Sequence, residues 1–119
     1  MTAANSYPET GDPPITQPTA RPHRRLRVAL AQIPIEDGNL EHNLHLAEEA
    51  AREAARQKVD FLNLPEAADW GWLYQDARRA ALPVPGRYTD FLVGLAREHR
   101  MWLSAGCLEK DVDKFSIPR

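Results

Sequence analysis

Three short apolar runs alternate with two stretches of helical periodicity, and this alternation constrains the fold more than any other feature of the chain. The apolar runs lie at residues 26–32, 59–64 and 101–107, and the helical patterns lie at residues 40–58 and 88–99. Continuous apolar runs separated by helices are typical of parallel strands that are joined by helical crossovers. The sequence therefore predicts an α/β domain with the order β-α-β-α-β.

The first helical pattern has a narrow, alanine-rich apolar face. Apolar side chains recur at positions i, i+4, i+7, i+11 and i+14 from Leu40 to Ala54, with charged residues on the other side. Asn39 precedes this pattern and is the expected N-cap. Asn43 lies on the apolar face, so we expect its side chain to be buried and hydrogen-bonded to backbone groups. A further short helix is expected at residues 74–82.

The chain divides into a tail and one organised part. Residues 1–24 are rich in proline and small polar residues and poor in apolar ones, which predicts a disordered tail. Residues 25–119 form the organised part, with a hairpin tip expected at residues 111–114. Strands that are apolar throughout need cover on both faces of the sheet, whereas two main helices can cover only one. The organised part is therefore interpreted as the N-terminal part of a larger, incomplete domain.

Composition excludes several classes of protein. The net charge of −2 gives no reason to expect nucleic acid as a partner, and a single cysteine excludes an internal disulfide framework. No apolar run approaches the roughly 20 residues that span a bilayer, so no membrane segment is expected. Arg24 and Arg25 could suggest a twin-arginine signal, but Arg27 interrupts the apolar stretch that follows. A cytoplasmic protein is the resulting expectation.

The strongest candidate for a functional residue is Glu66, which follows Pro65 at the end of the second apolar run. Open α/β sheets bind their ligands at the carboxyl ends of the strands, where a carboxylate is a candidate catalytic group. Trp70 and Trp72 lie close behind and are candidates for binding a substrate. Packing in the core is an equally good interpretation of these aromatic residues.

Two other sets of residues invite a functional interpretation that the pattern does not favour. Cys107 lies within an apolar run, so we expect a buried side chain with a packing role rather than a nucleophile. His42 and His45 are spaced i, i+3, but no third ligand converges with them, so no metal site is expected.

The order and spacing of several short motifs resemble the nitrilase or carbon–nitrogen hydrolase superfamily over residues 26–114. The motifs are the strand Arg27-Val28-Ala29-Leu30-Ala31-Gln32, the helix with Asn43, Leu64-Pro65-Glu66, Gly71-Trp72, Pro85-Gly86, Leu95-Ala96, and the pair Gly106 and Glu109. Each motif is weak alone, but together they occur in one continuous register.

The resemblance implies a four-layer α-β-β-α sandwich and a Glu-Lys-Cys triad, with no cofactor. In such a triad a cysteine thiolate attacks a nitrile, amide or carbamoyl carbon, and members of the family are usually homo-oligomers. Glu66 occupies the position of the glutamate, the general base. The lysine and the cysteine have no match: Ser116 stands where an asparagine is expected before the lysine, and Lys110 and Lys114 precede the lysine position.

Three interpretations remain. The chain is part of a nitrilase- or amidase-like hydrolase in which only the glutamate of the triad is present. The alternative is a catalytically inactive truncated fragment or an interaction module. A small nucleotide-binding domain is the third, but no glycine-rich loop follows Ala31 and Gln32.

Overall fold

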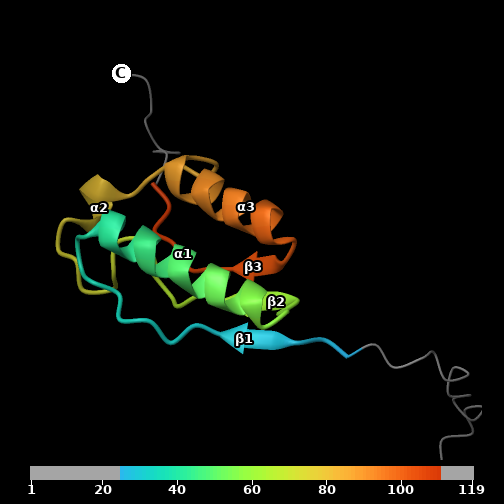
Figure 1. Cartoon of the computed structure of the whole chain (residues 1–119). Helices are drawn as coiled ribbons and strands as arrows, with labels where there is room; N and C mark the ends of the chain where they lie inside the picture. The colour runs from blue at the N-terminus through green and yellow to red at the C-terminus, as the bar shows by residue number, and fades with distance from the viewer. Residues whose placement is uncertain (1–24, 111–119) are drawn as a thin grey trace, which may run out of the picture.

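Three parallel strands form one sheet in the order β1-β2-β3, so β2 is central and the other two are edge strands. The strands are β1 (Val28–Leu30), β2 (Phe61–Asn63) and β3 (Trp102–Ser104), and the helices are α1 (Leu40–Arg56), α2 (Ala77–Ala80) and α3 (Arg87–His99). The structure is a computed structural model, and it describes residues 25–110. Figure 1 shows the arrangement of its elements. The chain is therefore an α/β protein, as predicted. The expected tail at residues 1–24 and hairpin at residues 111–114 lie outside the described residues.

Each strand is shorter than the apolar run that predicted it. Regular pairing covers three residues per strand, and two further bonds extend it toward the carboxyl end. These run from Ala31 N to Asn63 O (2.9 Å) and from Leu64 N to Ser104 O (2.8 Å). Beyond them come Pro34 and Pro65, which have no N–H group to donate to a ladder. The proline that limits β2 is thus the residue that places Glu66 outside the sheet.

Helix α1 forms as its sequence pattern predicts. The Asn39 side chain accepts a hydrogen bond from His42 N (3.1 Å), which confirms the predicted N-cap. The helix buries one face, made of Leu40, Asn43, Leu44, Ala47, Ala51 and Ala54. Three of these six residues are alanines, and their small side chains let α1 pack closely on the sheet. An ion pair between Glu41 and Arg87 joins the start of α1 to the start of α3.

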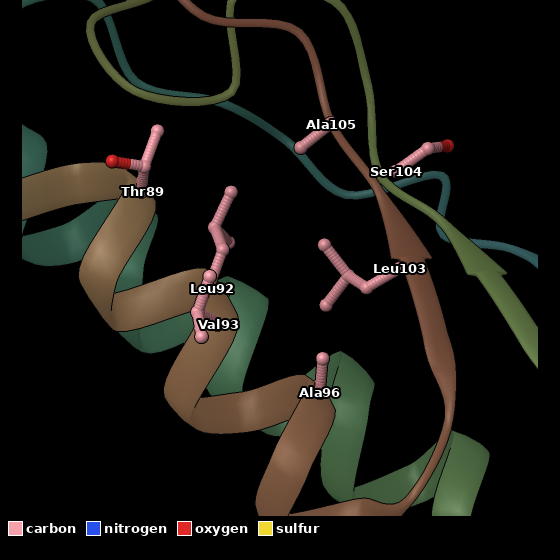
Figure 2. A pocket seen from close by; sticks show the side chains of 7 residues that line it. All are labelled: Thr89, Leu92, Val93, Ala96, Leu103, Ser104 and Ala105. Atoms are coloured by element: carbon pink, nitrogen blue, oxygen red, sulfur yellow. The ribbon is translucent and has the colours of Figure 1, made fainter. Parts of the chain in front are cut away.

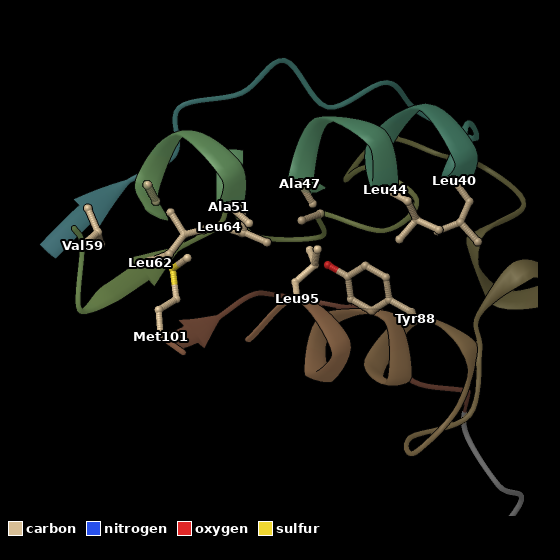
Figure 3. Packing of buried hydrophobic residues seen from close by; sticks show 12 residues of the cluster. Leu40, Leu44, Ala47, Ala51, Val59, Leu62, Leu64, Tyr88, Leu95 and Met101 are labelled. Atoms are coloured by element: carbon tan, nitrogen blue, oxygen red, sulfur yellow. The ribbon is translucent and has the colours of Figure 1, made fainter. Parts of the chain in front are cut away.

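The core lies between the sheet and the two long helices, which cover the same face (Figures 1 and 3). Ala29, Leu62 and Leu103 are register partners across the three strands, and all three belong to this core or pack against it. Neighbouring side chains of a strand point to opposite faces. The adjacent register row, with Val28 and Trp102, therefore lies on the other face of the sheet.

That other face is uncovered. Val28 is 51% exposed, Leu30 is 69% exposed and Trp102 is 76% exposed. The apolar run of β1 fits a strand that is buried on both faces in a complete domain, whereas the two main helices were expected to cover only one face here. The exposure of these side chains agrees with the second expectation. The reason is that α1 and α3 lie on one side, so alternate side chains of the edge strands remain in solvent. Within residues 25–110, no helix is long and apolar enough to cross a membrane.

Candidate active site

Glu66 lies directly beyond the carboxyl end of the central strand and is exposed. The residues before it, Leu64 and Pro65, leave the sheet, and Leu64 is only 2% exposed. A shallow hollow of about 620 Å³ borders this end of β1 and β2, and its lining includes Leu30, Asn63 and Pro65. Its volume falls in the range of small-molecule sites. Glu66 is not among the lining residues, so the hollow adjoins the segment just before the carboxylate.

Gly106 holds the segment around Glu66 against the chain that leaves β3. Its N–H donates to Pro65 O (3.1 Å), and its carbonyl accepts from Ala68 N (3.1 Å). A Cβ atom at this position would lie 2.7 Å from the Cα of Glu66 and 2.7 Å from the backbone nitrogen of Ala67. Only a glycine allows the two backbones to approach this closely.

Asn43 ties the same segment to helix α1. The side chain is fully buried, and its Nδ2 donates to Glu36 O (2.8 Å) and to Asp69 O (2.8 Å). Its Oδ1 accepts from Glu36 N (2.8 Å). The prediction that Asn43 is buried and bonded to backbone groups is confirmed.

Asp69 is a buried carboxylate that the sequence pattern did not single out. Its side chain is 1% exposed, and Oδ2 accepts a hydrogen bond from Leu108 N (2.8 Å). Its Oδ1 is buried and has no hydrogen-bond partner among residues 25–110. The signal available in the sequence was a charged residue three positions after Glu66 in an otherwise apolar segment, which is too common a pattern to stand alone.

Tyr88 closes this arrangement from helix α3. Its hydroxyl donates to Gly106 O (3.3 Å), and burial, with the nearby charge of Asp69 second, raises the pKa of Tyr88 above its ordinary range. The phenol therefore stays protonated and acts as a hydrogen-bond donor.

The two candidate substrate-binding tryptophans lie in different surroundings. Trp70 is half-buried, packs against the core and stacks on Tyr74 with ring centroids 5.7 Å apart. Its indole N–H is buried and has no partner within the described part of the chain. Trp72 is 69% exposed. Trp70 is thus a core residue and Trp72 a surface residue, and a role in substrate binding stays a prediction for both.

Cys107 is exposed, so the prediction of a buried cysteine is wrong. The apolar run continues past the strand, but β3 ends at Ser104, and the segment after it leaves the sheet. Partial desolvation, followed by the charges of Asp69 and Glu109, raises the pKa of the Cys107 thiol. An activated nucleophile needs a lowered pKa, so the surroundings of Cys107 act against that role.

Two further features lie outside this arrangement. His42 and His45 are exposed. The Nε2 atom of His42 lies 3.9 Å from Oε2 of Glu36, and that of His45 lies 3.4 Å from Oε1 of Glu49. No cluster of three potential metal ligands occurs among the described residues. A groove of about 340 Å³ between α3 and the free edge of β3 is lined by Leu92, Val93, Leu103 and their neighbours (Figure 2). None of its lining residues belongs to the segment that follows Glu66.

The chain is an α/β protein with a three-stranded parallel sheet and an exposed carboxylate beyond its central strand. Residues 27–117 match the family described as carbon-nitrogen hydrolase, and the chain belongs to that family. It is also similar to a protein of Pyrococcus abyssi (strain GE5 / Orsay) described as "Nitrilase", with 30% identity over 92 residues. The aligned region is 74% of this chain and 35% of that relative, so the chain spans about a third of the relative's length.

Proposed function

We propose that this chain supplies the general base of a carbon–nitrogen hydrolase and that Glu66 is that base. The supporting observation is the position of Glu66, which stands exposed beyond the central strand while its backbone packs against Gly106. A general base must be held at a fixed place and must also reach solvent or substrate. Membership of the carbon–nitrogen hydrolase family supports the same assignment.

The reaction is hydrolysis of a non-peptide C–N bond in a small nitrile, amide or carbamoyl compound. A thiol with an ordinary pKa of about 8.5 is mostly protonated at neutral pH, so a base must take its proton before the sulfur attacks carbon. With an amide or carbamoyl compound, Glu66 takes that proton and passes it to the leaving ammonia or amine, which leaves a thioester. With a nitrile, the thiol adds across the C–N triple bond to give a thioimidate, and a water must add before ammonia leaves and the thioester forms. Glu66 then takes a proton from the water that hydrolyses the thioester and returns it to the departing cysteine sulfur. The lysine of the triad stabilises the charge that develops on the tetrahedral intermediate.

The lysine and the cysteine of this triad are not supplied by the residues of this chain that match the family. Cys107, the only cysteine in the sequence, is exposed and its pKa is raised. The 119-residue chain alone therefore hydrolyses no nitrile or amide.

We further propose that the sheet is one layer of an α-β-β-α sandwich. The uncovered face with Val28, Leu30 and Trp102 is where a second sheet packs. The same exposed apolar face also favours a second function, that of an inactive module which binds another protein chain.

A chimera tests the role of Glu66. Residues 27–117 replace the matched segment of the P. abyssi nitrilase, whose remainder is expected to carry the lysine and the cysteine. Ammonia release from amides and nitriles is measured for the chimera, for Glu66→Gln and for a matched control, Glu98→Gln, at an exposed glutamate of α3.

We expect a loss of roughly 100-fold or more in kcat for Glu66→Gln, as for removal of a general base, and less than about twofold for Glu98→Gln. Equal activity of the chimera and its Glu66→Gln variant contradicts the proposal. A folded chimera that is inactive with every substrate favours the interaction module instead.

A further inference from the structure

Asp69 is the one charged residue that is buried among residues 25–110. It is 1% exposed, it lies three residues after Glu66, and one of its oxygens has no partner among residues 25–110. Burying a carboxylate is unfavourable unless its interactions offset the lost hydration. A carboxylate at this place therefore needs a reason beyond the packing of apolar side chains.

The contacts of Asp69 join three elements. Its Oδ2 accepts from Leu108 N at 2.8 Å, in the segment that leaves β3, and its carbonyl accepts from Asn43 Nδ2 at 2.8 Å, on α1. A hydrogen bond to an ionised acceptor is stronger than one between neutral groups. The residue thus fixes the segment after Glu66 to the segment after β3.

The bond to Leu108 lies two residues from Gly106, which packs against Glu66. Gly106 also bonds to Pro65 and Ala68, on either side of Glu66. Ala67, the residue after Glu66, has a positive φ of 47°, a backbone conformation that non-glycine residues adopt only when neighbouring contacts hold them there. Two bonds from Gly106 and one from Asp69 provide such contacts.

We propose that Asp69 is a positioning residue, which holds the chain after β3 in place and so fixes the backbone of Glu66. This positioning role rests on the proposed function of Glu66, whereas the hydrogen bonds of Asp69 do not depend on that function. Asp69 is buried and is not among the residues that line the hollow of about 620 Å³ beside β1 and β2. It acts through Leu108 and Gly106.

Hydrogen exchange of the full chain, read by mass spectrometry on overlapping peptides, tests this role. The variants are Asp69→Ala, which removes the acceptor, and Asp69→Asn, which keeps an acceptor oxygen but no charge. The matched control is Asp60→Ala, because Asp60 Oδ2 accepts from Arg27 N (2.8 Å) at the opposite end of the sheet.

We expect Asp69→Ala to speed exchange by roughly tenfold or more at residues 65–73 and 106–110 while leaving the second half of α1 unchanged. Asp69→Asn should restore most of the protection, and Asp60→Ala should leave both segments as they are. An equal rise throughout the chain, no rise, or no rescue by asparagine overturns the proposal.

Two readouts do not depend on whether Asp69→Ala folds. In the unchanged chain, the Leu108 amide should exchange at least roughly tenfold more slowly than in the unfolded chain, and an unprotected amide overturns the proposal. In Asp69→Asn, the pH at which Cys107 becomes reactive to a thiol reagent should fall, because a nearby negative charge is gone. An unchanged pH profile also counts against it. Glu66→Gln should alter neither readout, so a failure of the proposed function is distinguishable from a failure of this proposal.

Discussion

The backbones of Glu66 and Gly106 lie so close together that a Cβ atom at residue 106 would be 2.7 Å from the Cα of Glu66. These two residues are 40 positions apart in sequence, and each follows a different strand of the same sheet. The place of the candidate base is therefore set by the exit of β3 as much as by the exit of β2.

Replacing Gly106 with alanine should destabilise the chain by about 1–3 kcal/mol, because the added methyl group meets backbone atoms that cannot rotate away. The matched control is Gly94→Ala in α3, where nothing lies within 4 Å of the added group. That change should stabilise the helix by about 0.5–1 kcal/mol. Denaturant unfolding at one fixed chain concentration measures both. A stabilising Gly106→Ala would show that the close approach of the two segments does not occur in solution.

Asn43→Ala should cost about 2–4 kcal/mol, since it leaves the Glu36 N–H and the carbonyls of Glu36 and Asp69 without this partner. Asn39→Ala removes only the N-cap bond to His42 and should cost about 1 kcal/mol. The same unfolding measurement compares the two asparagines. Equal effects would mean that the buried network adds nothing beyond an ordinary cap.

Much of the fold could be predicted from the sequence because the relevant signals are local. The apolar period of α1, the cap at Asn39 and the proline after β2 each act within a few residues, and the structure bears them out. The open second face of β1 was predicted from the number of helices and could not be predicted from the apolar run of β1 alone. An apolar strand is the same in sequence whether its second face is covered or open, and the cover depends on elements outside the strand.

In the candidate site, too, local signals could be predicted from the sequence and contacts between distant residues could not. Glu66 was found through a local motif, and Asn43 through its place on an apolar helix face. Asp69 was missed because its partner, Leu108, is 39 residues away in sequence. Cys107 was placed wrongly because an apolar run does not reveal where the strand ends within it.

The uncovered sheet face should make the isolated chain associate or lose order. Burial of apolar surface is worth roughly 25 cal/mol per Å², and Val28, Leu30 and Trp102 present such surface on one face. The double variant Val28→Thr, Trp102→Thr should move the chain toward a monomer in size-exclusion chromatography. The control Trp72→Thr, Leu73→Thr, at residues 69% and 76% exposed elsewhere, should not. A sharp monomer peak of the unchanged chain with one cooperative transition would contradict this expectation.

Cys107 should react with a thiol reagent in the native chain without unfolding, because it is exposed. Its pKa is raised above the ordinary value of a thiol, chiefly by partial desolvation, so at pH 8 the folded chain should react more slowly than the unfolded chain. A raised folded-state pKa stabilises the fold below the ordinary pKa, and this contribution is lost as the pH rises through the folded value. This contribution to stability should therefore be lost as the pH rises through the raised pKa of Cys107, and Cys107→Ser should remove that part of the decline. Faster labelling in the native state would contradict the raised pKa.

The most direct test of the central claim is the rate at which the chimera with the P. abyssi nitrilase forms its acyl-enzyme. Rapid quenching and mass spectrometry of the intact protein follow the covalent adduct in a single turnover. If Glu66 is the base that activates the cysteine, Glu66→Gln should slow adduct formation by roughly 100-fold or more. The same rate of adduct formation in both proteins would show that Glu66 is not the base.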